Sequence, residues 1–175
     1  MVPTDVVVRG RQNPLHFKFP ERLRRARKLA GISGAALSAA AGLGHSGVGV
    51  LEVGAHLPRV NTIERLARAL DVSPTWLAFG LVVPLEKVEG PLRCEGLRER
   101  LREAQELCGL SLREVARRAG AGEGVAAAVK RGTMPTIDTL ETLAKALDVS
   151  PAWLAYGLGP MEASRRRMAS AARPL

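Results

Sequence analysis

Apolar residues recur every three or four positions in several short runs of this chain. Leu23, Ala26 and Leu29 keep this spacing until Gly31 ends the run, and the same pattern resumes at Ile63. Side chains three or four residues apart lie on one face of a helix, and glycine ends helices readily. The pattern therefore predicts an all-α protein made of short helices, each with one apolar face.

These helices belong to a repeat. Residues 69–80 read ALDVSPTWLAFG and residues 146–157 read ALDVSPAWLAYG, which is ten identities in twelve positions. The match continues toward the N-terminus of each copy, with one extra residue between Gly54 and Pro58 in the first copy. In both copies a serine precedes a proline, as is typical of a helix N-terminus. The tryptophan that follows is expected to anchor the core.

The repeat organises the chain into two homologous units. The first spans residues 19–80 (unit one) and the second spans residues 97–157 (unit two). The residues between them, 81–96, hold two prolines and two glycines and no helical period, which is typical of a linker. The ends of the chain are expected to form an N-terminal basic arm at 1–18 and a basic C-terminal tail at 158–175.

A helix-turn-helix motif is predicted in each unit. In unit one, residues 31–54 contain a short helix of small residues, a glycine-rich turn and a second helix at 45–53. Small side chains let the two helices pack closely, and glycine makes the turn. Such a second helix enters the major groove of DNA with its N-terminal residues. In unit two, residues 109–132 keep this scaffold, but the second helix begins at Glu123 and runs into three alanines, which leaves little to read bases with.

Two stretches carry a resemblance to a known family. GLGHSGVGVLEVG at residues 42–54 and the SPxWLxxG ending at 73–80 and 150–157 resemble the Xre/Cro/CI family of helix-turn-helix repressors. The resemblance covers both units and implies two tandem five-helix domains of the lambda-repressor-like fold. It also implies a sequence-specific, double-stranded DNA-binding transcriptional regulator of the repressor type. The helix of unit one would be its main reader, with unit two as a weaker reader or a pairing module.

The resemblance also implies where DNA is contacted. His45 and Ser46 fall on base-reading positions, and His56 just after the helix faces the same groove. In unit two, the carboxylate of Glu123 has the chemistry to accept a hydrogen bond from cytosine N4. Phosphate contacts follow from the resemblance in unit one and its arm, and from positive charge in unit two: Arg9, Arg11, Lys18, Arg59 and Thr62, then Arg113, Lys130 and Arg131.

Four positions in the two motifs are unusual. Gly34 and Leu112 depart from the family pattern, in which a polar residue at the start of the first helix contacts phosphate. Gly47 and Gly49 lie inside the second helix of unit one, where each glycine costs about 1 kcal/mol. They are expected to let the backbone approach DNA closely.

The charge of the chain favours a polyanionic partner. The 175 residues carry 26 Lys+Arg against 17 Asp+Glu, a formal net charge of +9. Unit one carries +4 and the two ends carry +2 and +3, whereas unit two carries only +1. Nucleic acid or an acidic membrane suits such a charge, but only 3% of the residues are aromatic, too few to stack single-stranded bases. Double-stranded DNA is therefore the expected partner.

No enzyme chemistry is indicated. Cys94 and Cys108 form no CxxC pair, and the histidines, His16, His45 and His56, lack the spacing of metal ligands. There is no phosphate-binding glycine loop. We therefore expect no cofactor, no metal and no catalysis. With neither a signal peptide nor an apolar run long enough for a membrane span, the protein is expected in the cytoplasm, associated with the nucleoid.

Two other functions stay open from the sequence alone. The small apolar face of the second motif also suits helix packing, so unit two could pair with its twin in a homodimer or higher oligomer, or with another protein. The helix-turn-helix scaffold would then serve as a protein-interaction adaptor. A sequence-neutral nucleoid-binding protein that holds DNA through its basic arms is the second alternative.

Overall fold

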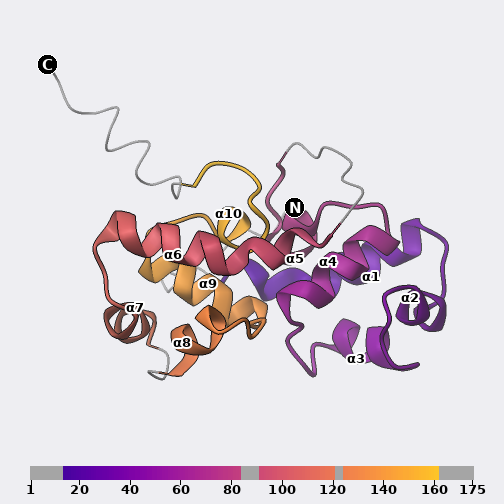
Figure 1. Cartoon of the computed structure of the whole chain (residues 1–175). Coiled ribbons are helices and arrows are strands. Elements are labelled where there is room, and N and C mark those ends of the chain that lie inside the picture. Colours follow the sequence, from indigo (N-terminus) through magenta and orange to yellow (C-terminus); the bar gives the residue numbers. More distant parts are fainter. Residues whose placement is uncertain (1–13, 84–90, 121–123, 162–175) are drawn as a thin grey trace, which may run out of the picture.

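The computed structural model describes residues 14–83, 91–120 and 124–161, and within these ranges every regular element is a helix (Figure 1). The elements of unit one, with the 3-10 helix that precedes it, are η1 (Leu15–Lys18), α1 (Phe19–Leu29), α2 (Gly34–Ala40), α3 (Gly47–Val53), α4 (Val60–Ala69) and α5 (Pro74–Phe79). Those of unit two are η2 (Arg93–Gly96), α6 (Leu97–Cys108), α7 (Leu112–Ala119), α8 (Gly124–Lys130), α9 (Ile137–Ala146) and α10 (Pro151–Tyr156). The all-α fold of two tandem units is thereby confirmed.

Side chains at the helix ends explain where several helices begin. Ser33 and Ser111 precede α2 and α7, and each side chain accepts the amide hydrogen three residues further on, at 3.1 Å. Ser73 does the same at the start of α5 (3.4 Å). These bonds satisfy amides that a helix leaves unpaired. Gly54 ends α3 with a φ of 76°, a left-handed conformation that favours glycine.

The interior of the motif in unit one matches its apolar pattern. Leu37 of α2 and Val48 of α3 are fully buried, and Leu51 is 7% exposed. These side chains face one another because α2 and α3 pack together. The short helix of small residues thus covers the inner face of α3, as the sequence predicts.

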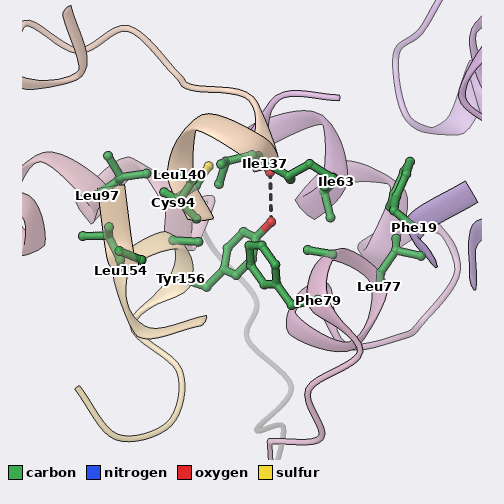
Figure 2. Packing of buried hydrophobic residues seen from close by; sticks show 14 of the residues in the cluster. Phe19, Ile63, Leu77, Phe79, Cys94, Leu97, Ile137, Leu140, Leu154 and Tyr156 are labelled. Carbon is green, nitrogen blue, oxygen red and sulfur yellow. Dashed lines mark hydrogen bonds between the residues drawn. The ribbon is translucent and has the colours of Figure 1, made fainter. Parts of the chain in front are cut away.

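Two buried aromatic residues, Phe79 and Tyr156, lie where the two units meet. Phe79 at the end of α5 and Tyr156 at the end of α10 are 2% and 1% exposed, and Figure 2 shows them side by side. Trp76 and Trp153, which the sequence favours as core anchors, are only half-buried. The reason is that α5 and α10 pack on each other across the units, so the residue on their shared side becomes buried.

The two units meet with approximate two-fold symmetry. The Val60 amide donates to the Pro135 carbonyl (3.0 Å), and the Ile137 amide donates to the Pro58 carbonyl (3.1 Å). Because these prolines are equivalent in the repeat, as are Val60 and Ile137, each bond is the image of the other. Symmetric dimers use such isologous contacts. Here the contact forms within one chain.

One hydrogen bond at this junction has no symmetry-related equivalent. The Tyr156 hydroxyl donates to the Val60 carbonyl (3.3 Å; Figure 2), whereas the equivalent Phe79 has no hydroxyl. Burial raises the pKa of Tyr156 well above its usual value, so the hydroxyl stays protonated and remains a donor. The two-fold relation is therefore approximate in chemistry as well as in sequence.

Each unit also holds the 3-10 helix of the other. Glu141 on α9 accepts hydrogen bonds from the first two amides of η1, at 2.7 and 3.2 Å. Glu64 on α4, its equivalent in the repeat, accepts from the first two amides of η2, at 2.6 and 2.9 Å. The first amides of a helix lack partners within it, and a carboxylate is a strong acceptor for them. Each glutamate is thereby joined, across the junction, to a short helix distant from it in sequence.

Arg22 of α1 and Arg100 of α6 fasten the helix ends beside this junction. Each guanidinium donates to two carbonyls at the end of the last helix of its unit, at 2.9 and 2.6 Å for Arg22 and at 2.9 and 2.7 Å for Arg100. Each also donates to the first residue of the preceding 3-10 helix, at 3.2 and 3.0 Å. Burial lowers the pKa of both side chains, but arginine stays charged in proteins. A cation at a helix C-terminus is favourable.

Two stretches expected to lack regular structure are partly helical. Residues 15–18 of the predicted arm and 93–96 of the predicted linker form η1 and η2. Helices of four residues leave no periodic signal, and these are held by carboxylates distant in sequence. Lys18 therefore lies on a docked helix with an exposed side chain. The other arm residues of interest, Arg9 and Arg11, lie outside the described residues.

Candidate nucleic-acid interface

The two helices predicted to read DNA lie on the same side of the molecule. Figure 1 shows α3 and α8 along its lower edge, with α2 and α7 toward the outer ends. In each unit the second helix of the motif packs on the first. The approximate two-fold relation explains the placement, because it brings equivalent elements to one side. We call this side, made by residues 45–56 and 124–131, the α3/α8 face.

His45 and Ser46 lie exposed at the start of α3. The helix begins at Gly47 rather than at residue 45, because its first helical bond runs from the Val50 amide to the Ser46 carbonyl (3.1 Å). His45 therefore belongs to the turn before the helix, and Ser46 is the N-cap. The two predicted base-reading residues are thus adjacent at the end of the helix that this motif directs into the groove.

The Ser46 hydroxyl is not used as a helix cap. Ser46 makes no side-chain capping bond. The Val48 amide, which such a cap would satisfy, donates instead to Oγ of Ser38 on α2 (3.0 Å), and Ser38 is fully buried. Ser38 therefore fixes the start of α3 against α2 and leaves the exposed Ser46 side chain without a role inside the helix.

Gly47 and Gly49, the two glycines inside α3, differ in whether the fold itself requires glycine at that position. A Cβ on Gly47 would lie 2.9 Å from Cβ of Leu43, so the packing of the motif itself requires glycine there. This contact explains Gly47 without any approach of DNA. Gly49 is exposed, and a Cβ there would meet nothing within 4 Å. Of the two glycines, only Gly49 leaves an exposed stretch of backbone that DNA could approach closely.

An ion pair holds the C-terminal half of α3 against α1. Arg27 Nε and Nη2 donate to the two carboxylate oxygens of Glu52 at 2.6 and 3.0 Å. This hydrogen bonding raises the pKa of Arg27 and outweighs the effect of burial. Arg24 donates to the Glu52 carbonyl at 2.7 Å. A bidentate pair fixes geometry as well as charge, so α3 is held at both ends.

The other predicted contacts of unit one follow α3. His56 lies exposed between α3 and α4. Arg59 is the N-cap of α4 and has an exposed side chain, while its backbone pairs with Thr136 at the junction. Thr62 is half-buried on the first turn of α4. The structure places these predicted phosphate contacts at the start of α4, beside the junction.

The corresponding helix of unit two offers a different surface. α8 begins at Gly124, and the predicted base contact Glu123 lies outside the described residues. The five residues after Gly124 are alanine and valine, all buried or half-buried. Lys130 at the end of α8 and Arg131 directly after it are exposed, as is Arg113 on the first turn of α7. The described part of α8 therefore presents positive charge at its C-terminal end and small apolar residues before it.

Unit two does not repeat the ion pair of unit one. The residues equivalent to Arg27 and Glu52 are Gln105 and Lys130, and the Gln105 amide donates to a backbone carbonyl (3.4 Å). Lys130 lines a hollow with Arg98, Glu99 and Arg102 of α6, a lining with three basic side chains and one acidic one. The end of α8 is therefore basic where the end of α3 is neutralised.

Sequence reasoning missed the residues that position α3. Ser38, Arg27 and Glu52 were not among the predicted site residues. A signal existed, because Ser38 stands where unit two has Ala116, and the Arg27–Glu52 pair has no equivalent in unit two. Differences between two copies of a repeat indicate positions with separate roles.

The described residues also bear on metal and thiol chemistry. Within the described ranges, no group of three or more histidine, cysteine, aspartate and glutamate side chains could hold a metal ion. Cys94 and Cys108 are free thiols, one buried and one half-buried. Across the same ranges, each helix is too short or too polar to cross a membrane.

A family model matches both units. The model of the helix-turn-helix family HTH_3 matches residues 23–77 and again residues 100–154, together more than half of the chain. The chain belongs to this family. The two matches of this helix-turn-helix protein end at equivalent positions of the repeat, residues 77 and 154, and their starts differ by one repeat position. They contain α2–α3 and α7–α8. A search of curated proteins and a search of solved structures each returned no match.

Membership in the HTH_3 family applies to both units. The Xre/Cro/CI resemblance seen in the sequence is confirmed for unit two as well as for unit one. HTH_3 proteins are DNA-binding regulators rather than enzymes. The α3/α8 face is accordingly a candidate surface for DNA.

Proposed function

We propose that this helix-turn-helix protein is a sequence-specific regulator of transcription that binds double-stranded DNA and acts as a repressor. Residues 45–53 of unit one are its main reader, and unit two is a weaker reader or a pairing module. The supporting observation is the start of α3, where His45 and Ser46 are exposed and Ser46 makes no capping bond.

The chemistry of these two side chains suits base edges. A neutral imidazole offers one donor and one acceptor, and a hydroxyl offers one donor and two acceptor sites. The major groove presents a distinct pattern of such groups for each base pair. Because Ser38 and Glu52 hold α3 at its two ends, His45 and Ser46 are presented by a fixed helix. His56 and Glu123 complete the proposed base contacts.

Phosphate contacts supply affinity in this proposal. They are assigned to basic and hydroxyl side chains of the arm, of unit one and of unit two: Arg9, Arg11, Lys18, Arg59, Thr62, Arg113, Lys130 and Arg131. Contacts of this kind position a protein on the duplex and carry no sequence information themselves. They make binding weaken as salt increases.

Sequence-neutral binding is the second candidate, and α8 favours it. Before Lys130 the described helix offers only glycine, alanine and valine. Unit two therefore brings charge without base-reading groups along this stretch. If unit one behaved in the same way, the protein would bind the nucleoid without choosing sites.

Selection of bound duplexes from a random pool, followed by sequencing, tests the proposal. We expect the native protein to enrich one motif, and the double variant His45→Ala, Ser46→Ala to lose that enrichment. Lys130→Ala is the matched control, which should enrich the same motif with lower yield. Binding without an enriched motif would favour the sequence-neutral function. A lack of binding even at low salt would favour a protein-interaction adaptor.

A further inference from the structure

We infer that one chain occupies one asymmetric DNA site, with unit one and unit two in neighbouring major grooves and with the base-sequence requirements concentrated in the half under unit one. The inference rests on the proposed DNA-binding function. It adds the number of chains on a site and the symmetry of that site.

The surface that joins the motifs is already occupied within the chain. An isologous contact pairs a patch with its own equivalent. Residues 58–60 bond to residues 135–137, and Glu64 and Glu141 hold each other's 3-10 helices. Both patches of the pair are therefore engaged. A second chain is not needed to bring two motifs together.

The resulting arrangement places both reading helices on one side of the molecule, as a dimer on DNA does. α3 and α8 lie along one edge of the molecule (Figure 1). Dimers of helix-turn-helix proteins place their two reading helices about 34–36 Å apart, which is one turn of the duplex. A duplex that runs along the α3/α8 face meets both helices. Because the units are joined, binding of one presents the other at high effective concentration.

The two halves of the face differ at the start of the reading helix. Unit one has His45 and the uncapped Ser46 there, both exposed. The residue of unit two equivalent to Ser46 is Gly124, which has no side chain. The described part of unit one therefore offers donors and acceptors for hydrogen bonds to base edges, and α8 offers none at its start.

The halves also differ at the end of the reading helix, in the opposite sense. Glu52 in unit one is held by Arg27, and the next residue is Val53. Their equivalents in unit two are Lys130 and Arg131, both exposed. Side chains of this kind hold phosphates, which are the same in every sequence. Unit two thus increases the affinity for DNA of any sequence, and unit one determines which sequence is preferred.

The site is tested with the full chain and a duplex from the selection above. Native mass spectrometry counts the chains on the duplex, and each base pair is replaced in turn. We expect one chain per duplex. A replacement in one half of the site should lower affinity about 5- to 150-fold, and in the other half less than about threefold. Inserting roughly half a turn of DNA, about 5 base pairs, between the halves should remove the contribution of unit two.

Variants separate the two roles. Lys130→Ala combined with Arg131→Ala should weaken binding to the selected and to a scrambled duplex by the same factor. It should also reduce the slope of log affinity against log salt by about 1.8, the value for two phosphate contacts. Lys145→Ala is the matched control, since this exposed lysine lies on α9 and not on α8. It should leave both affinities unchanged.

Each failure has a distinct meaning. Two chains per duplex, or a palindromic site with equal losses in both halves, would overturn the inference and leave the proposed function standing. A double variant that weakens only the selected duplex would overturn the anchoring role of unit two. The lack of any enriched motif would instead overturn the proposed function.

Discussion

Glu64 of α4 and Glu141 of α9 make the same contact from opposite sides of the junction. Each carboxylate accepts the first two amide hydrogens of the 3-10 helix that precedes the other unit. The residue on η1 that faces Glu141 is His16, whose ring is also hydrogen-bonded to it at 2.6 Å, whereas η2 has Cys94 at the equivalent place. These two glutamates join the tandem units into one body.

Replacing Glu141 by glutamine should destabilise the protein most near neutral pH. Burial alone would raise the pKa of Glu141, but hydrogen bonds from the His16 ring and from the amides of Leu15 and His16 outweigh it and lower the pKa. A carboxylate with a lowered folded-state pKa stabilises fully above its unfolded value of about 4.3, and this stabilisation is lost as pH falls through the folded value. In urea unfolding we expect Glu141→Gln to cost about 1.5–3 kcal/mol near pH 7 and much less near pH 3.

Glu114→Gln is the control for the Glu141→Gln experiment, because it also removes one carboxylate charge. The pKa of Glu114 is also lowered, first by a hydrogen bond from Arg117, but this pair is exposed on α7. Exposed ion pairs contribute little to stability, so Glu114→Gln should leave the unfolding midpoint nearly unchanged. A Glu141→Gln cost that is equal in acid and at neutral pH would mean that the charge of Glu141 does not hold η1.

The thiol of Cys94 should report whether the junction is closed. Burial and the neighbouring Glu64 carboxylate raise the pKa of Cys94 to about 12. Thiol reagents attack the thiolate, so alkylation near pH 8 should be on the order of a thousandfold slower at Cys94 than at an unhindered thiol. In urea, both Cys94 and Cys108 should react at the same rate. Rapid alkylation of Cys94 in the native protein, measured by mass spectrometry, would contradict a closed junction.

Ser38 should affect DNA binding without touching DNA. Ser38→Ala leaves the buried Val48 amide without its acceptor, which should cost about 1–3 kcal/mol of stability and loosen the start of α3. Ser111→Ala removes the cap of α7 in unit two at a cost of about 1 kcal/mol. Fluorescence anisotropy on a selected duplex should show several-fold weaker binding for Ser38→Ala only. Equal affinities for the two variants would contradict the positioning role of Ser38.

Gly49→Ala should separate stability from binding. A helix gains about 0.5–1 kcal/mol when alanine replaces an unstrained glycine, and a Cβ at Gly49 meets nothing within 4 Å in the free protein. Gly49 follows the N-cap Ser46 by three residues and His45 by four, the spacing that brings side chains to the same side at the start of α3. We therefore expect a higher melting temperature together with weaker DNA binding. A variant that is stabilised and binds normally would show that DNA does not approach α3 at this residue.

The helices of the fold were predictable, because the signals for them are local. Apolar spacing, the serine before each proline and the repeat itself indicate short helices in each unit, and the family resemblance implies that there are five. The half-burial of Trp76 and the full burial of Phe79 were not predictable from one unit. Which side of α5 is covered depends on α10, and such contacts between distant segments leave no periodic pattern. The 3-10 helices η1 and η2 were not predicted for the same reason, since each is held by a glutamate distant in sequence.

For the candidate site, the exposure of His45 and Ser46 matches the expectation from the motif, while their support did not show in the sequence. Glu64 and Glu141 could have been noticed, because an acidic residue recurs at the equivalent position of two amphipathic helices. The bond from Val48 to Ser38 depends on how closely α2 approaches α3. Spacing alone does not predict that distance.

The ratio of affinities for a selected and a scrambled duplex, measured at one salt concentration, tests the central claim most directly. We predict a ratio of about a thousandfold or more for the native protein. His45→Ala should reduce this ratio by removing about 1–3 kcal/mol from the selected duplex alone, whereas Arg59→Ala should weaken both duplexes equally and flatten the salt dependence. Equal affinity of the native protein for the two duplexes would contradict sequence-specific reading by α3.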